Sequence, residues 1–462
     1  MFRKIVSFYT KSAPSAPYQG DEKSQKKSYN RLRWQTFIAA TVGYSLYYVC
    51  RTSLNVVKKP VIESGALDAQ QLGYIGSALL FAYAIGKFVN GFLTDRSNIK
   101  RFMATGLIVS AAANLILGLL GLWSGETGLA TGGFFLFFAI LWGVNGWSQS
   151  MGAAPAIVSL SRWFPLKERG TFYGFFSASH NFGEFLSFVF VGLLVGVVGW
   201  QWGFTGAAVA GIIGVIIIAL FLHDTPESKG LPAIEAIAKE KTGAEIQNVS
   251  ATQKAVLKNP FVWILALSSA FMYISRYAVN GWGVLFLQEQ KGFSLETATQ
   301  IISINALLGI IGTVFSGWFS DKLFKGKRNM PALIFGILNA ISLVLFLYSG
   351  DSLWVNILSM VLFGIAIGVL ICFVGGLMAV DIVPRNATGA ALGIVGIASY
   401  IGAGLQDIVS GTLIEKNKVL SGTVNGVEQY QYDFTQAGLF WIGASVVSFL
   451  LATLVWKAKE ND

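Results

Sequence analysis

Two arginines, Arg51 and Arg276, each lie deep inside a long apolar segment of the chain. An Arg near the centre of a membrane-spanning helix costs at least about 2.5 to 3.5 kcal/mol, so it is expected to face a cavity or a charged partner. A guanidinium group stays protonated, and its fork of N–H donors matches two phosphate oxygens. The pair therefore predicts a binding site for a phosphate group. Alternatively, each Arg extends to the outer surface or pairs with a fixed carboxylate such as Glu184 or Asp407.

Two further titratable residues lie in apolar segments. Lys87 is eight residues before Asp95, about 12 Å from the inner end of its segment, so it belongs either to the binding site or to the membrane surface. His180 lies four residues before Glu184, on the same face of a helix. A charge change near pH 6.5 suits proton-coupled binding of phosphate. Pairing with Glu184 would raise the proton affinity of the imidazole, offset charge in the cavity, or hold the side chain in place.

Aromatic residues cluster beside these cations. The candidates for the binding site are Tyr44, Tyr48, Tyr83, Tyr273 and Trp282. Their rings present an apolar face and one polar atom, which suits a sugar phosphate. Because Tyr and Trp also anchor helices at the membrane interface, that alternative applies to each of them.

The segments that must position these residues are membrane-spanning helices. Of the 462 residues, 54% are hydrophobic and 13% are charged, which excludes an ordinary soluble protein. A bilayer requires about 20 apolar residues per helix, and we predict twelve spans. Their approximate boundaries are 36–57, 72–94, 102–122, 133–155, 170–198, 202–222, 261–286, 298–320, 331–349, 353–378, 387–413 and 436–456. With 2 His and 2 Cys, the chain is expected to hold no metal and no cofactor.

The Lys and Arg residues predict the orientation in the membrane, because short cytoplasmic loops carry an excess of them. With both termini in the cytoplasm, 26 of these residues lie in inside segments and 3 within spans. The 5 expected in outside loops are Lys58, Lys59, Lys291, Lys416 and Lys418. The net charge of +10 follows largely from this bias, so no nucleic-acid partner is expected. The first span follows about 35 polar residues, and we expect it to remain in the mature chain.

A repeat at half the chain length relates the two halves. Gly91-Phe-Leu-Thr-Asp95-Arg96 follows the second span, and Gly317-Trp-Phe-Ser-Asp321-Lys322 follows the eighth. Arg51 and Arg276 are likewise 225 residues apart. In each turn we expect the Gly to let helices approach and the Asp to cap a helix or pair with a cation. The turn resembles the loop signature of the major facilitator superfamily, which implies an all-α fold of two six-helix bundles related by a pseudo-twofold axis.

The expected regions of the chain follow from these spans. They are a cytoplasmic segment at 1–35, an N-terminal bundle at 36–222, a cytoplasmic linker at 223–259, a C-terminal bundle at 260–456 and a cytoplasmic tail at 457–462.

Six motifs, each found once, follow one another along nearly the whole chain. They are Gly43-Tyr44-x-x-Tyr47-Tyr48-x-x-Arg51, Lys87-Phe88-x-x-Gly91 with Ser97-Asn98, Lys167-Glu168-Arg169-Gly170, His180-Asn181-x-Gly183, Asp224-Thr225-Pro226-x-x-x-Gly230-Leu231-Pro232, and Asp321-Lys322-x-Phe324-x-Gly326-x-Arg328. Together they resemble the organophosphate:phosphate antiporters.

The resemblance implies exchange of a phosphorylated metabolite for inorganic phosphate. It matches Arg51 and Arg276 to the phosphate-binding pair, and Lys87 and His180 to accessory positions. The aromatic positions that it places around the ligand are Tyr48, Tyr83, Tyr273 and Tyr400.

Several positions depart from the pattern of that family. Gly281 stands where glycerol-phosphate and hexose-phosphate members usually carry Asp, Asn305 replaces a Glu, and Glu184 replaces a Gly. The Tyr-Gly-Pro often seen in the tenth span reads Val-Leu-Ile at 369–371. Leu392 and Val395 occupy the positions that resemble the specificity pair of the hexose-phosphate carriers. The phosphate-binding residues are kept while the remainder of the site is altered, so the sequence leaves the phosphorylated substrate open.

Three functions are compatible with these residues. The first is antiport by a monomer in a bacterial inner membrane, in which phosphate neutralises Arg51 and Arg276 and draws the bundles together. An empty carrier is then expected to switch slowly, which makes exchange obligatory. The second is a sugar-phosphate sensor that signals through a partner kinase. The third is a proton-coupled organic-anion transporter in which Glu184, His180 and Asp407 carry protons.

Overall fold

The computed structural model describes residues 2–127, 132–238, 256–325, 327–383, 388–424 and 427–458. Long helices dominate it. In chain order they are α2 (Glu22–Glu63), α3 (Ala69–Arg96), α4 (Ile99–Thr127), α5 (Gly132–Trp163), α6 (Leu166–Val198), α7 (Trp200–Phe221), α10 (Pro260–Gln290), α11 (Leu295–Phe324), α12 (Asn329–Tyr348), α13 (Leu353–Cys372), α15 (Thr388–Lys416) and α16 (Thr435–Leu454).

Short elements complete the fold. They are α1 (Phe2–Tyr9), a 3₁₀ turn (Glu227–Lys229), α8 (Ile234–Ala238), a π-helical turn (Phe373–Leu377), α14 (Met378–Asp381), strands β1 (Lys418–Val424) and β2 (Val427–Tyr432), and a 3₁₀ turn (Val455–Lys457). Most of the predicted linker, residues 239–255, lies outside the described residues.

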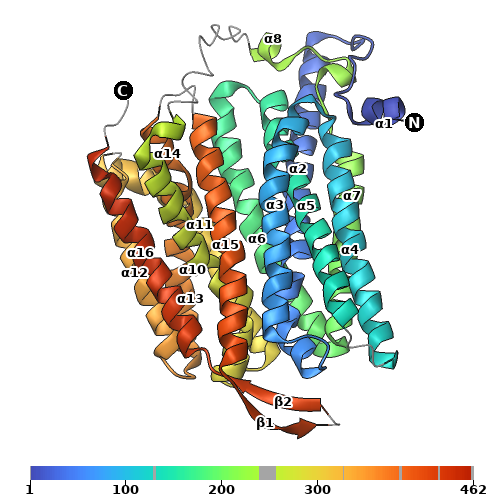
Figure 1. Cartoon of the computed structure of the whole chain (residues 1–462). Helices are drawn as coiled ribbons and strands as arrows, with labels where there is room; N and C mark the ends of the chain where they lie inside the picture. Colours follow the sequence, from blue (N-terminus) through green and yellow to red (C-terminus); the bar gives the residue numbers. More distant parts are fainter. Residues whose placement is uncertain are drawn as a thin grey trace.

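The long helices form two bundles that stand side by side (Figure 1). We call α2 to α7 the N-terminal bundle and α10 to α16 the C-terminal bundle. Helix α1 and the C-terminal end of α16 lie at one end of the molecule, here called the terminal side, and the β1–β2 hairpin projects from the other, here called the hairpin side. The described part of the chain contains twelve long helices in two bundles, as predicted.

Local sequence explains where several helices begin. Asp68 caps α3 through a reciprocal pair of hydrogen bonds with Gln71, and Asp21 accepts from the Ser24 backbone at the start of α2. Asn259 caps α10, where Pro260 occupies the first helical position and needs no hydrogen-bond partner for its nitrogen. These caps satisfy backbone N–H groups that the first turn of a helix leaves free.

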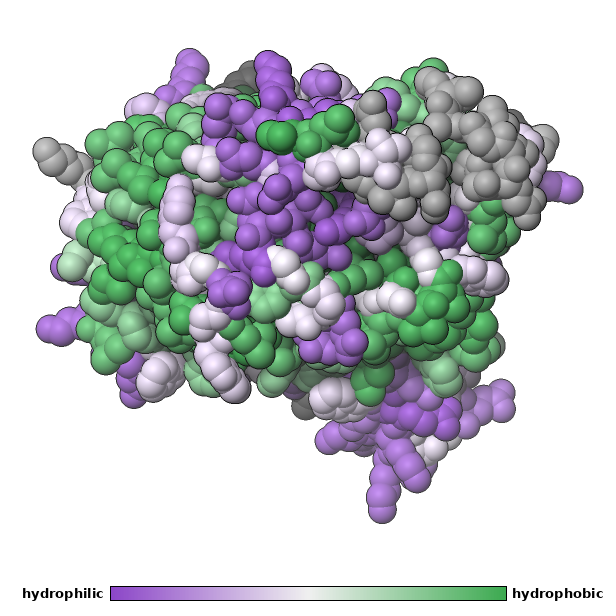
Figure 2. Space-filling model, turned by 90° about the horizontal axis from the view of Figure 1, so that it is seen from below, coloured by the Kyte–Doolittle hydropathy of each residue, from purple (hydrophilic) through white to green (hydrophobic). Residues whose placement is uncertain are grey.

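Apolar side chains cover the outer faces of the bundles, as expected for contact with lipid. Ten of the described helices are long and apolar enough to cross a membrane. The other two, α2 and α5, have comparable length but carry buried polar side chains, among them Arg51 in α2 and Gln149 in α5. Seen from the hairpin side, hydrophilic residues gather in the middle of the end face and hydrophobic residues lie on its flanks (Figure 2). The chain is an integral membrane protein with multiple spans.

The bundles contact each other closely on the hairpin side, where α3 packs against α15 and α6 against α11. A Cβ added to Gly73 would lie 2.4 Å from the backbone oxygen of Asp407, and one added to Gly192 would lie 2.6 Å from Thr299 Oγ1. Toward the terminal side, the positions of Gly174 in α6 and Gly393 in α15 have open space around them. Small residues thus permit a close interface at one end of the molecule.

Three details of the spans differ from the prediction. Helix α2 continues through Pro60 to Glu63, so Lys58 is a helical residue with 1% of its side chain exposed, not part of an outer loop. The tenth span is interrupted by the π-helical turn after Cys372. The segment between α15 and α16, for which no span was predicted, forms an antiparallel hairpin in which Lys418 pairs with Tyr432.

Candidate functional site

Arg51 occupies the middle of the interface between the bundles. Its Nη2 donates a hydrogen bond of 2.9 Å to the hydroxyl of Tyr277 in the opposite bundle. Its Cζ lies 4.3 Å from the ring centroid of Tyr83 and 5.5 Å from that of Tyr400. Only 4% of the residue is exposed. Stacking on aromatic faces compensates part of the cost of burying the charge.

Arg276 approaches the same place from α10. Its Cζ lies 5.6 Å from the ring centroid of Tyr277, the residue whose hydroxyl contacts Arg51. Its Nη2 is 3.4 Å from Glu184 Oε2. The two guanidinium groups, each from a different bundle, therefore both lie beside the side chain of Tyr277, one at its hydroxyl and one near its ring. The alternative of a fixed carboxylate partner also holds for Arg276, because Glu184 supplies it.

Tyrosine side chains surround the arginines. Tyr400 of α15 lies 4.5 Å from Tyr83 of α3 and 5.5 Å from Tyr273 of α10, measured between ring centroids. The Nζ of Lys87 lies 5.4 Å from the Tyr400 ring. Residues of both bundles thus form one cluster of tyrosines. The cations beside this cluster are Arg51, Lys87 and Arg276.

Two other candidate tyrosines line the N-terminal half of this site. The Tyr48 ring centroid lies 5.3 Å from Arg51 Cζ, and Tyr44 packs edge-on against Tyr48 at 5.5 Å. Both are buried.

Sequence reasoning missed Tyr277 as a site residue. It follows Arg276 directly and lies one turn after Tyr273, and the two rings stack at 5.9 Å. The spacing of four residues between Tyr273 and Tyr277, which places both on one helix face, is the signal that could have identified it.

His180 and Glu184 lie on one helix, but no ion pair between them is present in the described residues. Glu184 Oε1 accepts a hydrogen bond of 2.9 Å from Asn280 Nδ2, and Oε2 faces Arg276. The His180 ring lies 5.7 Å from that of Tyr48. The predicted pairing within the helix is therefore wrong, because the opposite bundle offers the carboxylate a permanently charged guanidinium and an amide donor.

Several buried polar atoms at the site have no hydrogen-bond partner among the residues that the structure describes. They are Arg51 Nη1, His180 Nε2, Asn181 Nδ2 and Asn280 Oδ1. Leaving such groups unsatisfied is costly, so a polar ligand or water is expected to complete them. A cavity between the bundles is lined by both halves, including Arg51, Glu184, Tyr277 and Asp407.

A second buried charge cluster lies beside this cavity, toward the hairpin side. Lys58 Nζ is 4.0 Å from Asp407 Oδ1 and 3.4 Å from the ring centroid of Trp282. Trp282 Nε1 donates a hydrogen bond of 2.9 Å to Asp407 Oδ1. Trp282, a candidate for the arginine site, therefore packs in this cluster against Lys58 and Asp407. Because Lys58 belongs to α2, and Trp282 and Asp407 to the C-terminal bundle, the cluster joins the two bundles.

A neighbouring ion pair reinforces the same contact. Lys59 Nζ lies 2.8 Å from Glu289 Oε1, again between α2 and α10. We refer to Lys58, Lys59, Trp282, Glu289 and Asp407 as the hairpin-side latch.

Asn305 makes no hydrogen bond to Arg51 or Arg276 among the described residues. Its Nδ2 donates to the Ile302 carbonyl in the same helix, and its backbone lies against Gly364 of α13. These contacts are structural and give no support for a role in binding.

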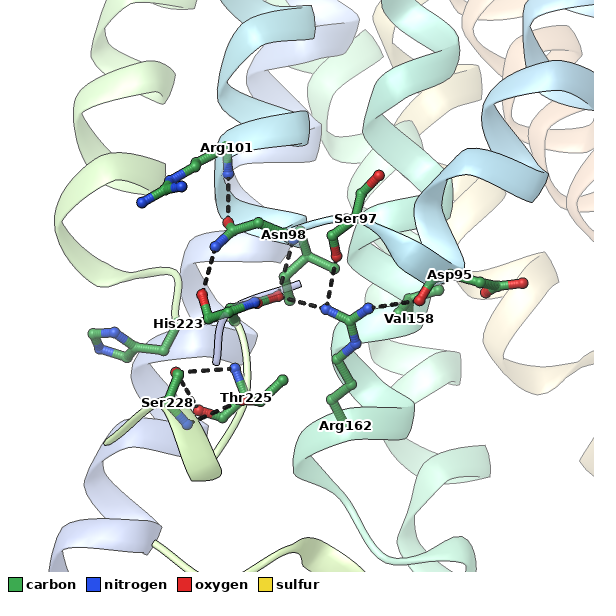
Figure 3. Close-up of polar contacts among 12 residues, drawn as sticks. Asp95, Ser97, Asn98, Arg101, Val158, Arg162, His223, Thr225 and Ser228 are labelled. Carbon is green, nitrogen blue, oxygen red and sulfur yellow. Dashed lines mark hydrogen bonds and ion pairs between the residues drawn. The ribbon is translucent and has the colours of Figure 1, made fainter. Parts of the chain in front are cut away.

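The segment Gly91 to Arg96, expected to be a turn after the second span, is instead the last part of helix α3, and this helix end contributes to a polar network on the terminal side (Figure 3). Arg162 Nη1 forms a 2.5 Å ion pair with Asp224, and Arg162 also donates to the backbone carbonyls of Ser97 and Asp95 at 3.0 Å each. The Arg96 carbonyl accepts from the Lys11 backbone at 3.0 Å. The end of α3 is therefore tied through backbone carbonyls to Arg162 in α5, which also pairs with Asp224 at the start of the linker.

The glycines of the two repeated turns do not make the expected close approach. A Cβ at Gly91 or Gly317 would meet no atom within 4 Å. Lys322 is exposed, and the side chain of Asp321 lies outside the described residues.

Arg169 caps the C-terminal end of α5. Its Nε donates to the Phe164 carbonyl at 2.8 Å and its Nη2 to the Ser161 carbonyl at 2.9 Å. It thereby satisfies carbonyl groups at a helix C-terminus.

Comparisons with known proteins agree with this architecture. A family model described as the Major Facilitator Superfamily matches residues 40–406. The chain is 33% identical to a probable hexose phosphate transport protein of Chlamydia trachomatis serovar D, over 96% of this chain and 95% of that protein. It is 31% identical to the glycerol-3-phosphate transporter of Bacillus subtilis, over 96% of each.

A solved structure has the same fold. It is a bacterial homolog of the human lysosomal transporter Spinster in an inward-facing and unoccupied conformation, with a TM-score of 0.72 and 17% identity over 93% of this chain and 99% of that one. The named relatives are transporters, not enzymes. The chain belongs to the major facilitator superfamily and, within it, to the organophosphate:phosphate antiporter family whose motifs it carries.

Proposed function

We propose that this protein transports a phosphorylated metabolite, a sugar phosphate or glycerol 3-phosphate, across a bacterial inner membrane and exchanges it for inorganic phosphate. The observation that carries the proposal is the convergence of Arg51 and Arg276, one from each bundle, on Tyr277. Arg51 Nη1 has no partner among the described residues, so it is available to a ligand oxygen. The hexose phosphate and glycerol-3-phosphate relatives support a phosphorylated substrate.

The bundle contacts favour alternating access as the transport mechanism. The latch and the close glycine contacts hold the hairpin side shut, while Gly174 and Gly393 toward the terminal side are free of contacts at Cβ. The excess of Lys and Arg in the predicted inside loops supports a cytoplasmic terminal side. We infer that the chain is in an inward-facing state, from which ligand binding between the arginines draws the bundles together.

Phosphate exchange in proteoliposomes tests this function. Arg51→Lys and Arg276→Lys keep the charge but lose the fork of donors, so each is expected to slow exchange of labelled phosphate about tenfold or more. Arg33→Lys is the matched control, because Arg33 pairs with Glu168 within the N-terminal bundle at 2.9 Å. Near-normal exchange by both site variants would refute the assignment.

The wild-type protein separates transport from sensing in the same assay. Displacement of bound phosphate by phosphorylated metabolites identifies the substrate class, and counterflow shows that it crosses the membrane. Binding without counterflow would favour the receptor function instead.

A further inference from the structure

Glu184 provides an anion of the protein's own inside the phosphate site. It lies on α6 of the N-terminal bundle, with 4% of the residue exposed. Its hydrogen-bond partners among the described residues, Arg276 at 3.4 Å and Asn280 at 2.9 Å, both lie on α10 of the C-terminal bundle. The carboxylate therefore spans the same interface that a bound phosphate would span.

Because Glu184 is negatively charged, it reduces the net positive charge that Arg51 and Arg276 give to the site. Arg51 and Arg276 bring two permanent positive charges from opposite bundles to one tyrosine. If no anion separates them, bringing the bundles together costs electrostatic energy in a site of low dielectric constant. The negative charge of Glu184 neutralises one of these two positive charges before any ligand binds.

The contact is nevertheless weak enough for a ligand to replace it. Charge-assisted bonds between a guanidinium and a carboxylate are usually about 2.7 to 2.9 Å long and often paired, whereas Arg276 makes a single contact at 3.4 Å with Glu184. Arg51 Nη1 and His180 Nε2 also remain without a partner among the described side chains. Glu184 thus balances charge without occupying all the donors that a phosphate group would use.

We propose that Glu184 acts as a tethered counter-anion that lets the unloaded carrier reorient, so that the protein catalyses net movement of its anionic substrate in addition to exchange. Exchange is obligatory in a carrier whose empty site cannot close. A carboxylate that moves with α6 and pairs with α10 lowers that barrier, and the empty carrier returns without phosphate. The inference rests on the proposed function and modifies only its coupling.

Efflux of labelled inorganic phosphate from proteoliposomes tests the inference. Efflux is measured into medium with and without unlabelled phosphate, with potassium and valinomycin present so that no membrane potential opposes net movement. For the wild type we expect efflux into phosphate-free medium at a rate within about tenfold of the exchange rate. For Glu184→Gln, which keeps the shape but loses the charge, we expect the ratio of exchange to net efflux to rise about tenfold or more.

Two further variants make the result specific. Glu168→Gln removes a carboxylate whose partner, Arg33, lies in the same bundle, so the ratio should remain that of the wild type. Glu184→Ala should raise the ratio of exchange to net efflux as Glu184→Gln does. It replaces Glu184→Gln in the test if that variant does not fold.

The outcomes separate this inference from the proposed function. Strict dependence of wild-type efflux on external phosphate would overturn the counter-anion role and leave exchange intact. An unchanged ratio in folded Glu184 variants would also overturn it. Absence of both exchange and net efflux in the wild type would overturn the proposed function and the inference with it.

Discussion

Replacing Asp407 with Asn should destabilise the hairpin-side latch. The change removes the only carboxylate within 4.0 Å of Lys58 among the described residues and leaves that ammonium group buried beside Trp282. Unit charges about 4 Å apart attract by about 4 kcal/mol at an effective dielectric constant of about 20. Breaking a buried pair by removing one partner typically costs about 3 to 5 kcal/mol. We therefore expect a loss of about 3 to 5 kcal/mol in the free energy of unfolding.

A double-mutant cycle isolates the contribution of the pair. Lys58→Met removes the ammonium group at similar length, and the double variant Lys58→Met/Asp407→Asn removes both charges. Because two opposite charges replaced together leave no isolated ion, the double variant should be more stable than Asp407→Asn alone. Equilibrium unfolding in mixed detergent micelles, followed by tryptophan fluorescence, measures all four proteins. A double variant that loses the sum of the single losses would show that Lys58 and Asp407 do not interact and would refute the latch.

Three other changes have defined outcomes. Gly76→Ala places a Cβ 2.2 Å from Asp407 Oδ2, so it should lower stability by about 1 to 3 kcal/mol; an unchanged melting temperature would contradict the close contact. Asp224→Asn weakens the bond from Arg162 Nη1 and the 2.7 Å bond from the Ser12 backbone, and limited proteolysis should cut the N-terminal segment faster than in the wild type. Burial, followed by the charges of Lys229, Lys100 and Arg31, lowers the pKa of His223 to about 4. Since the unfolded chain then binds the proton more readily, stability should fall as the pH drops from about 6.5 toward 4, and the melting temperature of His223→Gln should fall less over that range.

The membrane-spanning segments were predictable because local composition decides them. A run of about 20 apolar residues is sufficient to favour a helix across the bilayer, whatever it later packs against. The repeated segments at the ends of α3 and α11 and the matching positions of Arg51 and Arg276 indicated two similar halves, because a repeat is visible in the sequence itself. The end of α2 was misplaced because the positive charge of Lys58 reads locally as a loop. Only its contact with Asp407, far away in the chain, explains why that charge is buried.

The sequence alone also identified the arginines as the centre of the site, since a permanent cation in an apolar helix demands an anion. Their partners depended on the tertiary structure. Glu184 was expected to contact His180, four residues away on its own helix, yet it contacts Arg276 and Asn280 across the bundle interface. Spacing along a helix specifies which side chains are neighbours on that helix, whereas the packing of two bundles decides which of those neighbours meets a stronger partner.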